Sequence, residues 1–304
     1  MATIDLPAGP IDVIDTRGDG PVVVLVHGLL MDGEIWREVT ADLRADHRVV
    51  APTLPLGAHR TPMRPGTDLS MTGQADLLAQ VLDRLDADDV TLVANDWGGP
   101  LITAARHPQL IDRLVVTPCE AFDNLPPGLP GRVADLSARM PGGLLLAAQS
   151  LRVRALQRLP LTFGPMAVGP LPQDLVQRSL RPLRTQRAVR RDLASYVRTT
   201  RGDELEAIVD DLAVLDVPTL VAWTTDGRMM PAEHGPRLAE LVPHGHYAEI
   251  DDARVLVQLD QPATVARLVR EFIRSHPLDA VTGAAAGATG GAARGAVPPA
   301  RATA

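Results

Sequence analysis

The strongest candidate for covalent chemistry in this 304-residue chain is Asp96. It follows the apolar run Leu92–Ala94 and the polar Asn95, and it precedes Trp97-Gly98-Gly99. A strand that ends in a polar residue and is followed by small residues and a helix is the setting of a nucleophile elbow. Asp96 would lie on the sharp turn, where the N-terminus of the next helix stabilises negative charge. Its carboxylate would then be a nucleophile for an ester-forming displacement. Asp96 could instead only cap the helix.

A second loop is expected beside this turn. His27-Gly28-Leu29-Leu30 follows another apolar run, and its backbone N–H groups, together with that of Trp97, could form a hole for an oxyanion or a leaving group. The ring of His27 is expected to support the loop rather than act as a base. We therefore count Gly28, Leu29, Leu30, Asn95 and Trp97 as candidate substrate-binding residues.

The elements that must position these residues alternate along the chain. Short apolar, β-branched runs predict strands, and longer stretches with helical spacing predict helices, among them Leu69–Leu85 with Ser70 as its N-cap and Gln261–Ser275. Continuous apolar strands separated by helices indicate a mostly parallel α/β sheet covered on both faces. The predicted strands are Pro21–Val26, Arg48–Leu54, Asp89–Ala94, Leu114–Thr117, Pro218–Trp223 and Tyr247–Ile250.

Residues 122–215 interrupt this alternation with short helical patterns broken by Pro and Gly. We predict core segments at 1–121 and 216–278, a helical cap at 122–215, and a disordered Ala- and Gly-rich tail at 279–304. Between Arg132 and Arg201 there are 13 Arg and three Asp, a local charge of +10. A positive cap would attract an anionic small-molecule substrate. These arginines could instead pair with acidic residues or face solvent.

Composition excludes several classes of protein. The net charge of −7 argues against nucleic acid as a partner, and the single cysteine, Cys119, cannot form an internal disulfide. The sequence has no apolar run of about 20 residues, no export signal, no nucleotide-binding glycine motif and no histidine pair at metal-ligand spacing. We therefore expect a cytoplasmic protein with no membrane contact, no cofactor and no metal. Both a monomer and a homodimer remain open.

The order of these features resembles the α/β-hydrolase fold superfamily over roughly residues 10–276. The elbow Asn95-Asp96-Trp97-Gly98-Gly99 is similar to the elbow of haloalkane dehalogenases and of epoxide hydrolases that use an aspartate nucleophile. It is unlike the G-x-S-x-G of esterases and lipases. The resemblance implies an Asp nucleophile, a helical cap and a catalytic acid and histidine from later loops.

The acid and the base implied by the resemblance are harder to place. Glu120 stands where one dehalogenase subgroup carries its acid, and Asp226 lies one position before the usual place after a later strand, with Asp123 as a weaker choice. The family histidine is missing, because Val255 occupies its position. Without that base, water would be poorly activated and a covalent intermediate could stall. His59, in a loop that borders the site in this fold, is the best substitute, although it could only stabilise the loop.

The substrate-binding signatures of both relatives are incomplete. Leu29 replaces the asparagine that helps dehalogenases hold a halide, and only one tyrosine, Tyr196, lies in the predicted cap, where epoxide hydrolases use two. Three hypotheses follow. The chain is a hydrolase acting through Asp96 on a haloalkane, epoxide or ester bond; a lyase or isomerase with Asp96 as a base; or a weak homologue that binds a small ligand.

Overall fold

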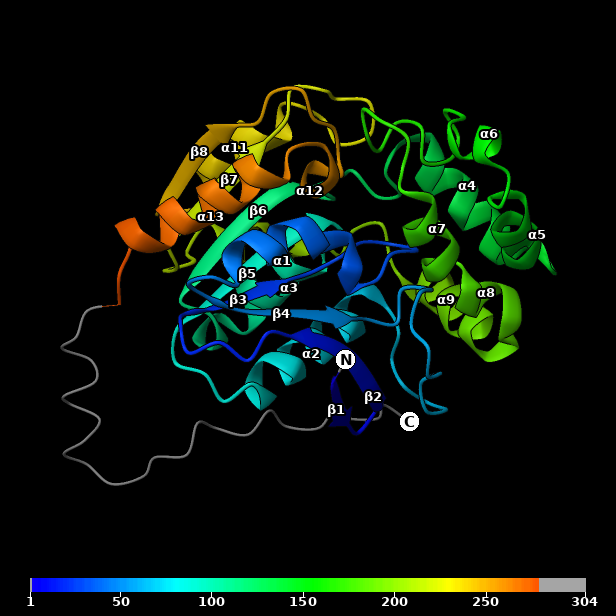
Figure 1. The fold of residues 1–304 in the computed structure, drawn as a ribbon, viewed down its shortest axis with the longest axis horizontal. Helices are drawn as coiled ribbons and strands as arrows, with labels where there is room; N and C mark the ends of the chain where they lie inside the picture. The colour runs from blue at the N-terminus through cyan, green and yellow to red at the C-terminus, as the bar shows by residue number, and fades with distance from the viewer. Residues whose placement is uncertain (1, 279–304) are drawn as a thin grey trace.

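The computed structural model describes residues 2–278, and one eight-stranded sheet runs through its centre (Figure 1). The strand order is β1-β2-β4-β3-β5-β6-β7-β8. β1 and β2 form an antiparallel hairpin, β2 pairs antiparallel with β4, and all later pairs are parallel. The strands are β1 Ala2–Leu6, β2 Gly9–Asp15, β3 Val22–Leu25, β4 Arg48–Thr53, β5 Val90–Asp96, β6 Arg113–Cys119, β7 Thr219–Trp223 and β8 Gly245–Glu249.

Helices cover the two faces of this sheet (Figure 1). α1 packs against α13 on one face, and α2 packs against α3 on the other. The helices of the core are α1 Arg37–Leu43, α2 Met71–Arg84, α3 Gly99–Arg106, α11 His234–Leu241, α12 Val257–Asp260 and α13 Pro262–Ser275, with short 3-10 turns η1 Gly33–Trp36 and η2 Pro108–Leu110.

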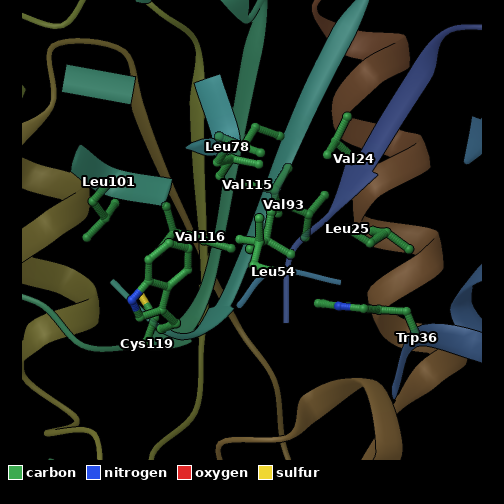
Figure 2. Close-up of a cluster of buried hydrophobic side chains, with 14 of the residues drawn as sticks. Val24, Leu25, Trp36, Leu54, Leu78, Val93, Leu101, Val115, Val116 and Cys119 are labelled. Carbon is green, nitrogen blue, oxygen red and sulfur yellow. The ribbon is translucent and has the colours of Figure 1, made fainter. Parts of the chain in front are cut away.

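The core lies on both sides of the central strands. Every residue of β3, β5 and β6 is buried, as expected for parallel strands sandwiched between helices. Figure 2 shows side chains of these three strands, such as Val24, Val93 and Val115, gathered with Leu78 of α2 and Leu101 of α3. This packing fixes the carboxyl ends of β3, β5 and β6, where the candidate functional loops begin.

The predicted α/β architecture is confirmed. Each predicted strand is present within a few residues of its expected bounds, and Ser70 Oγ caps α2 by accepting a hydrogen bond of 3.0 Å from Gly73 N. The hairpin β1–β2 was not predicted. Pro7-Ala8 joins its two strands, and β2 pairs with β4, which is far away in the sequence. That pairing makes the hairpin part of the sheet. The predicted tail at 279–304 lies outside the described residues.

The stretch between β6 and β7, residues 122–215, is called the helical insertion below. It contains helices and no strand. Figure 1 shows most of it on the right, beyond the end of strand β4, and not beside the outer strands β1 and β8. Within residues 2–278, no helix is both long enough and apolar enough to cross a membrane. The insertion helices are α4 Gly128–Arg139, α5 Gly143–Ser150, α6 Arg154–Gln157, α7 Gln173–Ser179, α8 Arg181–Thr185, α9 Arg187–Thr199, η3 Glu206–Ile208 and α10 Val209–Leu212.

Arg254 joins the insertion to the core. Its Nε lies 3.0 Å from Asp226 Oδ2, and its Nη1 donates to the carbonyls of Gly164 and Ala167 at 2.9 and 2.7 Å. The Asp260 carboxylate accepts from the N–H groups of Arg254 and Val168. Since Arg254 is only 18% exposed, these charge-assisted bonds are partly shielded from water and are stronger than surface pairs.

Replacing Arg254 with Ala should lower the free energy of unfolding by about 2–3 kcal/mol, because it removes the partly buried donor to Asp226 and the donor to the carbonyls of Gly164 and Ala167. Urea unfolding followed by circular dichroism measures the change. Arg267→Ala is the matched control, since the Arg267–Glu271 pair is exposed and should contribute less than about 0.5 kcal/mol. Equal effects of the two changes would contradict a specific fastening role for Arg254.

Candidate functional site

Asp96 lies at a strained turn between β5 and α3. Its backbone φ is +63°, in the left-handed region that aspartate tolerates better than most residues. The register between β5 and β6 shifts between Ala94 and Asp96, so the strand leaves its regular pairing at this residue. Trp97 N donates to Asn95 O at 2.7 Å, which closes the turn tightly. The predicted strand–turn–helix context of Asp96 is therefore present.

The Gly28 loop closes over the Asp96 carboxylate. A β-carbon at Gly28 would lie 1.8 Å from Asp96 Oδ2, so only glycine permits this approach. The next backbone N–H, that of Leu29, donates a hydrogen bond to the carboxylate. Leu30 has a φ of +63° and its N–H donates to Leu56 O at 2.9 Å, which fixes the loop. Of the expected N–H groups, Leu29 N–H reaches Asp96, while Trp97 N–H is used in the turn.

His27 supports this loop, as expected. Its Nδ1 lies 2.8 Å from Gly28 O, and its Nε2 accepts a hydrogen bond of 3.0 Å from Leu54 N. Both ring nitrogens are therefore occupied. The ring joins the loop after β3 to the end of β4 and has no proton acceptor left for catalysis.

Glu120 approaches Asp96 from the end of β6. Its N–H donates to Asp96 O at 3.2 Å, and its Oε2 accepts from Gly98 N at 3.3 Å. Asp96 is 5% exposed and Glu120 8% exposed. A β-carbon at Gly98 would lie 2.6 Å from Glu120 O, so the small residue after the elbow lets the two segments approach. Two of the predicted candidates thus lie in one buried space.

Burial dominates the electrostatics of this space. It raises the pKa of Asp96 to about 7, although the Leu29 N–H opposes the shift. Burial and then the negative charge of Asp96 raise the pKa of Glu120 well above its usual range. Among residues 2–278, no cationic side chain contributes to either shift. Burial therefore favours the protonated form of both carboxyl groups, and the charge of Asp96 adds to this effect at Glu120.

Trp97 and Tyr196 lie beside the carboxyl groups. Both side chains are buried, and Tyr196 reaches the site from α9 of the insertion. Burial and the charge of Glu120 raise the pKa of the Tyr196 hydroxyl well above its usual range. Trp97 lowers that pKa, so its indole faces the hydroxyl, yet Trp97 Nε1 has no hydrogen-bond partner of good geometry among the described residues. Among the described residues, the buried Trp97 Nε1–H is thus a donor without a partner in this region.

Asn95 faces the opposite side of the elbow. Its Nδ2 donates to Val255 O at 2.6 Å and Thr117 Oγ1 at 2.9 Å, and its Oδ1 accepts from Gln258 Nε2 at 2.8 Å. These bonds occupy both ends of the amide. These contacts favour a structural role for the Asn95 side chain, which anchors the elbow, over the predicted role in substrate binding.

The same network explains what replaces the family histidine. The Val255 side chain is buried, and its carbonyl accepts from Asn95 Nδ2. Asp226, one of the two candidate acids, is held by Arg254 and Arg228 instead of by a histidine. Asp226 is therefore part of the fastening of the insertion, and nothing brings it into contact with Asp96. Glu120 is the candidate acid that the structure brings to Asp96.

His59 is buried between the core and α9. Its Nε2 lies 3.3 Å from Asp192 Oδ2, and the same oxygen accepts from Met63 N at 2.8 Å. No hydrogen bond in the described part of the chain joins His59 to Asp96. Its Nδ1 is buried without a partner. These contacts favour the loop-stabilising interpretation of His59 over the role of a base.

Asp192, Arg254 and Gln258 hold the site in place, and the sequence analysis predicted no role for them. A possible signal for Asp192 was its isolation as the only acidic residue in the basic helix α9. For Arg254, the signal was a charged residue next to Val255, at the position of the family histidine, together with an acidic residue, Asp226, earlier in the chain. Neither signal identifies a partner without the fold.

Comparison with known proteins agrees with the fold. A model of the family described as alpha/beta hydrolase fold matches residues 21–262. The structure is similar to that of a thermophilic esterase from Thermogutta terrifontis, with a TM-score of 0.69 and 22% sequence identity over 91% of this chain and 99% of the esterase. At that identity the likeness concerns the fold alone.

Sequence relatives are distant. An uncharacterised protein of Mycobacterium tuberculosis is 36% identical over 33% of this chain, an alignment that spans only 29% of that relative. A haloalkane dehalogenase of Mesorhizobium japonicum is 34% identical over 32% of each chain. A cis-3-alkyl-4-alkyloxetan-2-one decarboxylase of Xanthomonas campestris is 24% identical over 86% of this chain and 90% of the relative.

The raised pKa of Asp96 makes a prediction about stability. The unfolded carboxyl ionises near pH 3.8 and the folded one near pH 7, so the folded state binds more protons between these values and stability falls as pH rises through them. Above about pH 7 the loss is complete. Asp96→Asn removes this penalty and should gain about 2–3 kcal/mol relative to wild type between pH 5 and pH 8, at 1.36 kcal/mol per pKa unit.

Urea unfolding of both proteins at several pH values measures this difference. Asp83→Asn is the control, because Asp83 is exposed on α2 and forms no ion pair within residues 2–278, so its replacement should leave the pH dependence unchanged. A constant difference between wild type and Asp96→Asn from pH 5 to pH 8 would show that Asp96 ionises normally.

Proposed function

The chain belongs to the alpha/beta hydrolase fold family, and we propose that it is a hydrolase that attacks a small organic substrate through Asp96. The observation that carries the proposal is the buried Asp96 carboxylate on a left-handed turn, with the Leu29 N–H donating to it. A fixed carboxylate at this position can reach an electrophilic carbon without first having to reorganise. The bond attacked is a carbon–halogen, epoxide or ester bond.

The proposed reaction has two steps. In the first, an Asp96 oxygen forms a bond to the substrate carbon while the bond from that carbon to the leaving group breaks. In the second, water attacks Asp96 Cγ, and the bond between Cγ and the Asp96 oxygen that was joined to the substrate carbon breaks. That oxygen leaves in the product with one proton from the water, and the water oxygen stays in the Asp96 carboxyl group. The Leu29 N–H stabilises the negative charge that develops on the Asp96 oxygen during that attack.

The substrate is proposed to be uncharged. The insertion carries many arginines, but several pair with acidic residues, as Arg178 does with Asp32 and Glu34. No cation contributes to the pKa of Asp96 or Glu120 among the described residues. Two carboxyl groups without a cation would repel an anionic substrate at the reacting end. We propose that the positive charge of the insertion attracts substrates from solution and does not bind them at Asp96 and Glu120.

A second candidate function follows from Val255. With an apolar side chain in place of the histidine, a reaction that regenerates Asp96 without water fits the site. The relative from Xanthomonas campestris is named as a decarboxylase of an oxetan-2-one. Loss of CO2 from such a ring gives an alkene and balances without water. The lyase candidate therefore keeps Asp96 and needs no hydrolytic base.

One experiment separates these functions. Wild-type protein is incubated in H2¹⁸O with panels of haloalkanes, epoxides, esters and an oxetan-2-one, and Asp96-containing peptides are weighed by mass spectrometry. Hydrolysis through Asp96 should place ¹⁸O in its carboxylate, because water attacks Cγ, and Asp96→Asn should abolish turnover. Asp216→Asn, a change at an exposed surface position, is the control.

Each outcome assigns the function differently. Turnover with ¹⁸O in Asp96 supports hydrolysis through a covalent intermediate. Turnover that requires Asp96 but leaves it unlabelled identifies the lyase. Turnover that survives in Asp96→Asn would contradict both, and binding without turnover would identify a ligand-binding homologue.

A further inference from the structure

The carboxyl group of Glu120 is the ionisable group best placed to exchange protons near Asp96. It is bonded to the backbone of Gly98, two residues after Asp96, and its own backbone N–H bonds to Asp96 O. The other titratable side chains that interact with this pair, Cys119 and Tyr196, are acids whose pKa values burial raises. They would be neutral and poor bases at neutral pH.

The two residues that sequence comparison would put forward as base or acid are otherwise engaged. His59 is bonded to Asp192, and Asp226 is bonded to Arg254. Val255 has no group that can carry a proton. Within residues 2–278, Glu120 is therefore the side chain near Asp96 that can both release and accept a proton during the reaction.

We propose that Glu120 is the acid and base of the reaction at Asp96, so that two carboxyl groups divide the work that the family gives to an aspartate and a histidine. This inference rests on the proposed hydrolytic function and names the side chain that completes it. Its physical basis is geometric: both carboxyl groups are buried, the Glu120 N–H bonds to Asp96 O, and the Glu120 carboxyl group bonds to Gly98 N, two residues after Asp96. Two buried carboxyl groups on adjoining segments favour a state in which one is protonated while the other is ionised.

In the first step, ionised Asp96 attacks a carbon of the substrate while Glu120 is protonated. The bond from that carbon to an oxygen leaving group breaks, and the oxygen takes the Glu120 proton. The products are an alkyl ester of Asp96, a hydroxyl group and ionised Glu120. The same division between a nucleophilic and a proton-transferring carboxyl group operates in retaining glycosidases.

In the second step, Glu120 removes a proton from water as the water oxygen adds to Asp96 Cγ. The bond from Cγ to the alkyl oxygen then breaks, and that oxygen takes the proton back from Glu120. Asp96 is left as a carboxylic acid, and its proton passes to Glu120. One water is consumed and both carboxyl groups return to their starting states.

This arrangement selects a class of substrate. A protonated Glu120 accelerates departure of an oxygen, which needs a proton, and gives no comparable help to a halide, which leaves as a stable anion. It also favours uncharged substrates, since the pair carries negative charge. The structure therefore points to neutral epoxides or strained cyclic ethers rather than haloalkanes as preferred substrates.

The test compares Glu120→Gln with wild type in the full chain, using styrene oxide and 1-bromobutane as probes. Glutamine keeps the shape and the acceptor for Gly98 N but cannot transfer a proton. Alkylation by styrene oxide should slow by roughly a hundredfold or more, while alkylation by 1-bromobutane changes little. Hydrolysis of the butyl ester should slow as strongly, so that intact-protein mass spectrometry shows the butyl adduct accumulating.

Glu204→Gln is the matched control, because Glu204 bonds to Thr72 and Arg201 rather than to Asp96. Hydrolysis of the butyl enzyme at the wild-type rate in Glu120→Gln would overturn the inference and leave the proposed function intact. Stalling in His59→Ala but not in Glu120→Gln would also overturn it. Absence of any adduct or product with wild type would overturn the proposed function, and the inference with it.

Discussion

The Asp96 carboxylate lies against the backbone of Gly28, and the surrounding loops are built to permit this contact. A β-carbon at Gly28 would overlap Asp96 Oδ2, and the φ of +63° at Asp96 is what turns the carboxylate toward the glycine. Such a backbone conformation costs of order 1–3 kcal/mol and persists only where the surroundings impose it. Here the fully buried strand β5 holds one side of the turn, and the amide of Asn95 holds the other.

The loop that contains Arg254 and Val255, where the family carries its histidine, has a structural role in this protein. Val255 supplies a carbonyl to Asn95, and Arg254 supplies a guanidinium to Asp226 and to two carbonyls of the insertion. A positively charged Arg254 paired with Asp226 also prevents that carboxylate from orienting a base. The residues at the place of the family histidine thus fasten the helical insertion to the core, and Glu120 is left as the ionisable partner of Asp96.

Local patterns were enough to predict the central sheet, because apolar β-branched runs such as β3 and β5 have few alternatives to a buried parallel strand. They also placed Asp96 on its turn. The hairpin β1–β2 and the partners of His59 and Asp226 depend on contacts between residues far apart in the chain. The orientation of Asn95 could not be predicted either, because a side chain before a sharp turn can face either side of it.

The insertion also affects the chemistry of the carboxyl pair. Tyr196 of α9 and Leu205 approach the site from the insertion, and Leu205 lies within 2.9 Å of where a β-carbon of Gly98 would be. By excluding water, these side chains lower the local dielectric and strengthen the repulsion between Asp96 and Glu120. Burial, reinforced by that repulsion, raises the pKa of Glu120 and favours its protonated form. The insertion is therefore part of the acid–base system, since a more open site would let both carboxyl groups ionise and would leave no proton to donate.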